Sequence, residues 1–207
     1  MIGVSELWQR GAAGESFSGA DWYAEAIGAV RFTDCVFSDV DLTEASTTGA
    51  MFESCTFHNC RFNASQHHAT AFVGCDFRRS SFFTAVLDGC KLTGSVFAEC
   101  TLRPITVQGG AWASVTLRGA DLSGVDLTGV DLRDADLAMA DLTGAVLVDA
   151  RLGGATPRDA DLKGADLRRA SVDRVDLASA HLEETRIDLS AAVMLAELHG
   201  AVVDLAE

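Results

Sequence analysis

Acidic side chains at a regular spacing are the residues of this sequence best suited to act on another molecule. Through the second half of the chain, aspartate recurs just before the leucine of successive five-residue units, as in Ala-Asp-Leu-Ser-Gly. Aspartate in such a position can hydrogen-bond the amides of the next turn. Carboxylates on a rigid support can also sum to a negative field. We expect this field to come from Asp121, Asp126, Asp131, Asp136, Asp141, Asp161 and Asp166.

His67 is the second candidate, because it occupies a position that is apolar in most units. A histidine there is either a hydrogen-bonded core residue or a ligand or base. Its neighbours 20 residues away are Thr47 and Leu87, and neither is a carboxylate, a histidine or a nucleophile. No nucleophile, base and orienting group converge, and the 19 glycines form no phosphate-binding loop. We therefore expect no enzyme, no catalytic residue, no cofactor and no small-molecule substrate.

The six cysteines all occupy the small position two residues before an apolar centre, which is typical of a compact buried residue. Three of them are spaced by 20 residues and could in principle be bridged, although a cytosolic chain keeps its thiols reduced. Paired-cysteine zinc spacing is absent, so we expect no metal site. The cysteines are Cys35, Cys55, Cys60, Cys75, Cys90 and Cys100, and the three with 20-residue spacing are Cys35, Cys55 and Cys75.

One repeat must position all of these side chains. A large apolar residue recurs at every fifth position from Phe17 to Ile187 without insertion or deletion, interrupted only by Thr47, His67 and Pro157. A period of five matches neither a helix nor a strand, so the chain must turn a corner in every unit. A short fixed repeat over most of a chain is typical of a solenoid, in which stacked units share one core.

The phenylalanines predict how the units stack. If four units complete one square turn, residues 20 apart lie above one another, as Phe37, Phe57 and Phe77 then would. Aromatic rings pack well in such columns. Pro157 sits at a unit centre and lacks an amide for the ladder between coils, so we expect a local bulge there.

The two ends of the repeat need covers. Ser5 to Arg10 could form one helical turn, with Trp8 over the first coil. The sequence from Ser190 to His199 reads as a helix that Asp188 or Ser190 can cap. This helix either seals the last coil or also pairs with a second copy. We expect the dimer interface to contain Val193, Met194, Leu195, Leu198, Val202 and Val203.

The chain is acidic, with a formal net charge of −14 over 207 residues. This charge argues against direct binding of nucleic acid, and it fits either a basic partner or solubility alone. No run of about 18 apolar residues is present to span a membrane, and the first residues lack the features of a secretory signal. We expect a cytoplasmic protein without membrane contacts.

The repeat resembles that of the pentapeptide-repeat family, whose units carry a central Leu or Phe and a small residue two places before it. The resemblance implies an all-β solenoid, a right-handed quadrilateral β-helix, to which this chain adds a short C-terminal α-helix. We accordingly divide the chain into an N-terminal cap (1–14), the β-helix (15–189), and a C-terminal helix and tail for dimerisation (190–207).

Shorter motifs, taken in order, resemble the MfpA/Qnr-type fluoroquinolone-resistance proteins of that family. The motifs are Ala50-Met51-Phe52, Ser65-Gln66-His67, Gly94-Ser95-Val96-Phe97, Leu102-Arg103-Pro104, Ile187-Asp188-Leu189-Ser190-Ala191-Ala192 and His199-Gly200. The resemblance implies a cytoplasmic homodimer that mimics DNA, binds DNA gyrase (a type II topoisomerase), inhibits or modulates it, and can protect it from fluoroquinolones. The chain lacks loops between coils and carries an extra N-terminal segment, which leaves open whether it protects gyrase or only inhibits it. An interaction scaffold for another protein is the alternative.

Overall fold

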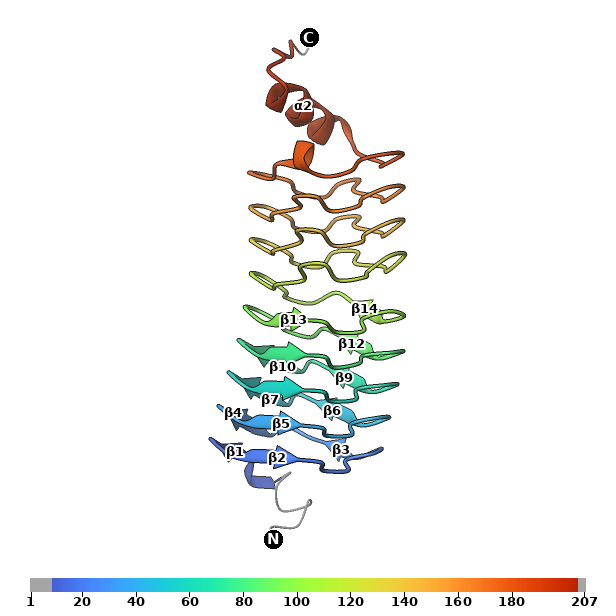
Figure 1. The fold of residues 1–207 in the computed structure, drawn as a ribbon. Helices are drawn as coiled ribbons and strands as arrows, with labels where there is room; N and C mark the ends of the chain where they lie inside the picture. The colour runs from blue at the N-terminus through green and yellow to red at the C-terminus, as the bar shows by residue number, and fades with distance from the viewer. Residues whose placement is uncertain (1–8, 205–207) are drawn as a thin grey trace.

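The chain forms a straight, four-sided column that ends in a helix (Figure 1). The computed structural model describes residues 9–204. Each five-residue unit makes one side of the column, so residues 20 apart lie in register on adjacent coils. The predicted turn over Ser5 to Arg10, with Trp8, lies almost entirely outside the described residues.

Three sides of the column are parallel sheets in their N-terminal part. The first sheet, here the β1 face, contains β1 (Ala12–Ala13), β4 (Arg31–Thr33), β7 (Met51–Glu53) and β10 (Ala71–Val73). The second, the β2 face, contains β2 (Ser16–Ser18), β5 (Val36–Ser38), β8 (Thr56–His58), β11 (Asp76–Arg78) and β13 (Val96–Ala98). The third, the β3 face, contains β3 (Ala26–Ile27), β6 (Ser46–Thr48), β9 (Gln66–His68), β12 (Val86–Asp88) and β14 (Thr106–Gln108). Sheet pairing thus begins at Ala12, before the predicted start of the repeat at residue 15.

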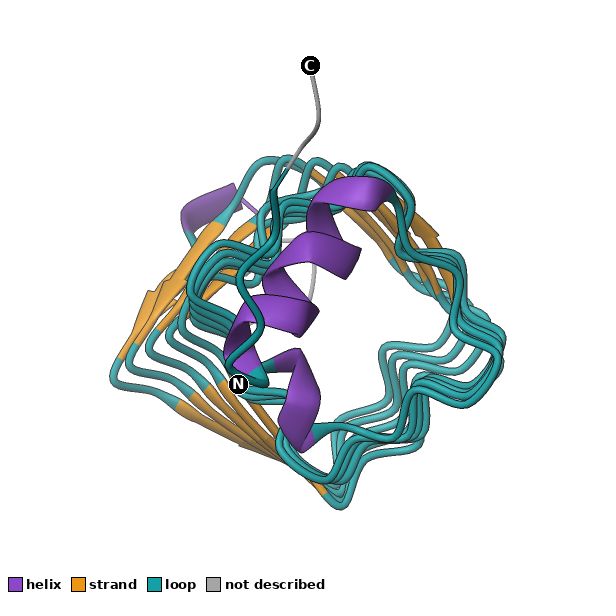
Figure 2. Ribbon diagram, turned by 90° about the horizontal axis from the view of Figure 1, so that it is seen from above, coloured by secondary structure: helices purple, strands orange, loops and turns teal. Residues whose placement is uncertain are grey.

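The fourth side consists of turns along its whole length, as the view down the column shows (Figure 2). We call it the Leu122 face and define it by its units, which are centred on Trp22, Leu42, Phe62, Phe82, Leu102, Leu122, Leu142, Leu162 and Leu182. Beyond β14, isolated parallel bridges between residues 20 apart continue the ladder on all sides as far as Arg186. The hydrogen-bonded column therefore outlasts its strands.

The phenylalanine column predicted from the sequence is confirmed. The rings of Phe37 and Phe57 stack with centroids 4.6 Å apart, and those of Phe57 and Phe77 are 4.7 Å apart. Rings on neighbouring sides meet edge to face instead, as Phe52 and Phe57 do at 5.6 Å. Both are favourable aromatic geometries, and all of these side chains are buried.

The column uses two kinds of corner, and they explain the residue two places before each centre. In the strand units, a side chain 23 residues further along donates to the carbonyl of the centre, as Cys60 Sγ does to Phe37 O and Ser80 Oγ to Phe57 O. In the turn units, the amide three residues on donates to that carbonyl instead, as in Val125 N to Leu122 O. Buried carbonyls need a partner. A strand corner therefore favours Cys or Ser, whereas alanine or valine suffices in a turn.

The cysteines thus act as small donors inside the column. All six are free, five are buried, and Cys100 is half-buried. Burial raises the pKa of Cys60, Cys90 and Cys100 to about 11. The thiols of these three residues therefore stay protonated, which suits donation to a carbonyl and opposes reactivity.

His67 is a hydrogen-bonded core residue. It is 1 % exposed, and its ring nitrogens contact Thr47 Oγ1 at 2.7 Å and Ser65 Oγ at 2.9 Å. Because Ser65 Oγ donates to Phe62 O, it accepts from Nε2, and Nδ1 then accepts from Thr47. Burial lowers the pKa of His67 to about 4, so the ring is neutral and its hydrogen bonds are satisfied.

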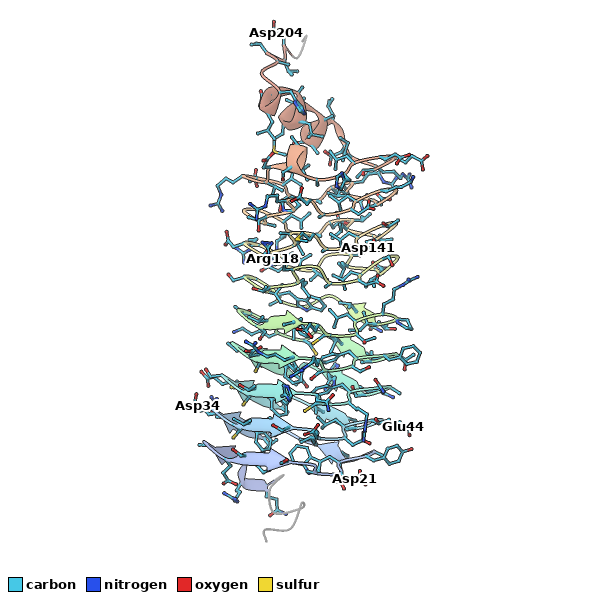
Figure 3. All side chains as sticks on the ribbon, viewed as in Figure 1. Asp21, Asp34, Glu44, Arg118, Asp141 and Asp204 are labelled. Carbon is cyan, nitrogen blue, oxygen red and sulfur yellow. The ribbon has the colours of Figure 1, made fainter. Side chains whose placement is uncertain are left out.

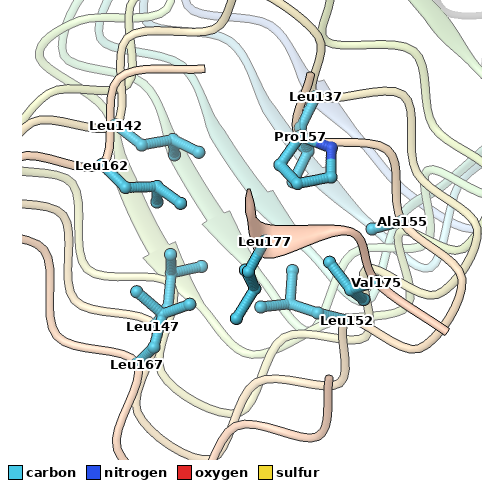
Figure 4. Close-up of a pocket in the computed structure, with 10 residues that line it drawn as sticks. All are labelled: Leu137, Leu142, Leu147, Leu152, Ala155, Pro157, Leu162, Leu167, Val175 and Leu177. Atoms are coloured by element: carbon cyan, nitrogen blue, oxygen red, sulfur yellow. The ribbon is translucent and has the colours of Figure 1, made fainter. Parts of the chain in front are cut away.

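The ladder breaks where Pro157 removes an amide. The coil below is paired through Asp136 and Thr156, but among residues 9–204 no bridge joins Thr156 to Asp176. The coil above forms the 3₁₀-helix η1 (Leu177–Ser179) in place of a regular corner. The interior here holds a cavity of about 10 Å³ lined by leucines and Pro157 (Figure 4). The disruption expected at Pro157 is present, in the form of a 3₁₀ turn in the next coil.

The helix α2 (Leu189–Leu198) crosses the open last coil. Asp188 caps its start by accepting from Ala191 N at 3.1 Å, and it also accepts from Arg169 N at 2.9 Å. Met194 and Leu195 pack against the core of the column. The helix therefore performs the sealing role that the sequence predicts.

Candidate functional site: an acidic face

The turn corner fixes the carboxylate that precedes each centre. Oδ1 of Asp121, Asp141 and Asp161 accepts the amide of the residue two places on, at 3.0, 2.9 and 2.9 Å. The same bond forms in the other four units, so the turn role is confirmed for every aspartate of the predicted set. The remaining four are Asp126, Asp131, Asp136 and Asp166.

The structure does not gather these seven carboxylates on one face. Asp121, Asp141 and Asp161 lie in register on the Leu122 face. The unit positions place Asp126 and Asp166 on the β3 face, Asp131 on the β1 face and Asp136 on the β2 face.

Arginines shield four of the seven carboxylates. Asp131, whose side chain is 5 % exposed, contacts Arg133 at 2.8 Å and Arg151 at 2.9 Å. The hydrogen bond from Arg133 is the main cause that lowers the pKa of Asp131. Asp166 is held in the same way by Arg168 and Arg186, and its pKa falls to about 2, chiefly through Arg168. These two carboxylates contribute little field at a distance.

Looser pairs join the other shielded carboxylates to arginines. Asp121 lies 4.0 Å from Arg103, and Asp136 lies 4.0 Å from Arg118. Within residues 9–204, Asp126, Asp141 and Asp161 have no ion pair. The unshielded part of the predicted set is therefore mainly on the Leu122 face.

Adding the charges of whole faces shows an asymmetry across the column. The Leu122 face carries eight acidic residues, Asp21, Asp41, Glu44, Asp121, Asp141, Asp161, Glu183 and Glu184, against three basic residues, Arg61, Arg103 and Lys163. The units of the opposite β1 face, from Phe32 to Val172, carry five of each sign: Asp34, Glu53, Asp131, Asp134 and Asp173 against Arg31, Lys91, Arg133, Arg151 and Arg174. Figure 3 places Asp21, Glu44 and Asp141 along one side of the column and Asp34 along the other. The acidity therefore has a direction.

Sequence reasoning missed the N-terminal members of this face. Asp21, Asp41 and Glu44 precede the regular Asp-Leu units, yet Asp21 and Asp41 are in register with Asp121 at 20-residue steps. Arg61 pairs with Asp41 at 2.8 Å, and Lys163 pairs with Glu183 at 2.9 Å. Counting charges by 20-residue columns would have found the face.

The C-terminal helix presents a second surface. Leu198 and Val202, both in the predicted dimer interface, are 49 % and 90 % exposed, and Leu189, which the prediction omits, is 71 % exposed. Val193 and Met194 help to line a groove of about 400 Å³ between α2 and the last coil. Val203 is half-buried. Leu195, by contrast, packs on its own column.

Two other kinds of site were sought in the described part of the chain. No cluster of three His, Cys, Asp or Glu side chains is placed to hold a metal ion there. Nor does that part contain a helix that is long and apolar enough to cross a membrane.

The repeat matches a known family model. The model described as Pentapeptide repeats matches in 8 copies, over residues 31–65, 113–147, 140–178 and 158–190. No curated protein sequence matches the chain.

Solved structures share the column. A trypsin-treated form of QnrB1, described as a plasmid-mediated fluoroquinolone resistance protein, has 20 % identity and a TM-score of 0.82, and the match covers 93 % of this chain and 96 % of that one. Full-length QnrB1 has 18 % identity and a TM-score of 0.77, with 92 % and 99 % covered. At these identities the likeness shows the fold alone.

Proposed function

Because this chain belongs to the pentapeptide-repeat family, we propose that it is a DNA-mimicking member that binds DNA gyrase and inhibits or modulates it. The observation that carries the proposal is the Leu122 face, where acidic residues outnumber basic ones by eight to three on a straight column. A protein that binds duplex DNA presents basic groups to phosphates. The group of proteins that the sequence resembles points to gyrase as that basic partner.

The spacing of the carboxylates supports partial mimicry. Adjacent coils rise by about 4.8 Å, so Asp121, Asp141 and Asp161 form a row of charges at about that interval. One strand of duplex DNA carries a phosphate every 3.4 Å or so. The row therefore approaches the charge density of a single strand. Its carboxylates are already fixed by turn amides, so little side-chain freedom is lost on binding.

A homodimer would lengthen the column. We propose that α2 pairs with its symmetry mate through Leu198 and Val202, together with Leu189, because these apolar side chains are exposed beside the last coil. Leu198→Asp should then halve the mass measured by light scattering without unfolding the column. An unchanged mass would exclude this seam. Leu195 is a poorer test, since a charge there would also disturb the seal on the last coil.

Supercoiling by purified gyrase tests the function. The protein should inhibit supercoiling at micromolar concentration, and inhibition should weaken as salt rises, because the contact is electrostatic. Adding a fluoroquinolone to the same assay shows whether gyrase is also protected from the drug. No effect at micromolar protein and low salt would end the gyrase proposal and favour a scaffold for another protein.

A further inference from the structure

Two aromatic side chains break the inward rule of the repeat. Every other phenylalanine is the apolar centre of its unit, but Phe83 comes directly after the centre Phe82 and points outward. Tyr23, the single tyrosine of the chain, stands in the same position after Trp22. Phe83 is 50 % exposed and Tyr23 is 52 % exposed. Both belong to the Leu122 face, in one column and three coils apart, which is about 14 Å.

The fold does not require aromatic residues at these positions. The residues between them in the same column are Thr43 and Asn63, which are polar. Asn63 accepts a hydrogen bond from Ser81, and the hydroxyl of Tyr23 is held by Glu44. Half-exposed aromatic rings on a stable surface are typical of anchors in protein interfaces, where aromatic residues are enriched.

We propose that Tyr23 and Phe83 insert into two apolar sockets of the basic protein surface that the Leu122 face binds, an inference that rests on the proposed binding of gyrase. Charge complementarity selects the occupant, because the rings stand on the most acidic face of a chain with a net charge of −14. A duplex has no protruding rings. The anchors therefore supply recognition that imitation of DNA alone cannot, and they distinguish the true partner from other basic surfaces.

Binding of the full-length protein to purified gyrase, titrated at several salt concentrations, tests this inference. Phe83→Ala and Tyr23→Ala should each raise the Kd by about tenfold or more. The slope of log Kd against log salt should stay that of the wild type, because no charge is removed. Asp141→Asn should instead flatten the slope. Met139→Ala is the matched control, since Met139 is an equally bare apolar side chain, 62 % exposed, on the β2 face.

The outcomes separate the two claims. If wild-type protein binds gyrase and neither aromatic variant differs from Met139→Ala, the anchors are excluded and the proposed function stands. If wild-type protein does not bind gyrase, the proposed function fails and the anchors fall with it. Light scattering is run on the same variants. A fall in mass on Phe83→Ala would show that a second copy occupies the rings, which also overturns the inference.

Discussion

The two halves of the column solve one problem in different ways. In the N-terminal half, phenylalanine centres stack in strands, and buried Cys or Ser side chains donate to the corner carbonyls. In the C-terminal half, leucine centres sit in tight turns that satisfy their own carbonyls, and an outward aspartate accepts the amide that is left. The first solution keeps its polar atoms inside, and the second places carboxylates on the surface.

This difference teaches caution about the acidity of the C-terminal half. Each carboxylate there has a structural reason to exist, so the number of aspartates alone says little about a partner. What the corner chemistry does not explain is the uneven distribution of counter-charges. Arginines shield Asp131 and Asp166, whereas Asp141 and Asp161 have no such partner within residues 9–204. The functional signal is therefore the asymmetry between faces.

The largest effect should come from placing a charge inside the Leu-centred half. Leu137 is 2 % exposed. Leu137→Lys should cost more than about 5 kcal/mol and abolish cooperative unfolding of that half, because the ammonium has no partner there. Met139→Lys, two residues away and exposed, should change stability by less than about 0.5 kcal/mol. Thermal melts that were similar for both variants would contradict the inward assignment.

The next effect should be confined to the Phe-centred half and depend on pH. Burial holds the pKa of His67 at about 4, below the ordinary value of about 6.5. The unfolded chain therefore takes up a proton that the folded chain does not as pH falls from 6.5 to 4. The stability present above pH 6.5 should fall by about 3 kcal/mol across this window.

Urea unfolding at pH 7 and pH 4.5 measures this loss for His67. The variant His67→Gln lacks the titration and serves as the control. Parallel pH curves for wild type and variant would show that the ring titrates normally and that its burial is misjudged.

A smaller effect should distinguish the two corner chemistries. Ser80 Oγ donates to Phe57 O and accepts from Cys60 N, so Ser80→Ala leaves two buried backbone groups without that partner. The expected cost is about 1–3 kcal/mol, read from chemical denaturation. Ala145→Ser, the reciprocal change in a turn corner, should bring no gain, because Ala145 N already donates to Leu142 O. Equal effects of the two changes would remove the distinction.

The smallest effect should come from the outward carboxylate. Asp141→Ala removes one acceptor from the exposed amide of Thr143 and should cost about 0.5–1 kcal/mol. Asp141→Asn keeps an acceptor oxygen in the same place and should unfold like the wild type. A loss for asparagine as large as that for alanine would mean that charge, not the turn bond, stabilises the corner.

Sequence reasoning captured the features that local spacing determines. The five-residue period predicts the column, the stacking of Phe37 on Phe57, and the turn role of the aspartates, and all three are present. The Asp188 cap of α2 was also foreseen. Each of these depends on residues that are close in sequence or a constant 20 residues apart.

The features that sequence reasoning missed depend on side-chain reach. Arg133 and Arg151 converge on Asp131 from its own coil and from the next, a choice that period alone does not reveal. Leu195 packs on its own column while Leu198 faces out, because the crossing direction of α2 decides which side is covered. The 3₁₀ turn at Leu177 arises one coil beyond its cause, Pro157.

Gyrase binding by charge-neutral variants of two faces tests the central claim most directly. The triple variant Asp121→Asn, Asp141→Asn and Asp161→Asn keeps its turn bonds but removes three charges from the Leu122 face. The control triple, Asp126→Asn, Asp149→Asn and Asp166→Asn, removes the same charge from the β3 face. We predict that the first triple loses most of the inhibition of supercoiling at low salt and that the control retains it. Equal losses in the two triples would show that only net charge matters, and would contradict a directional acidic face.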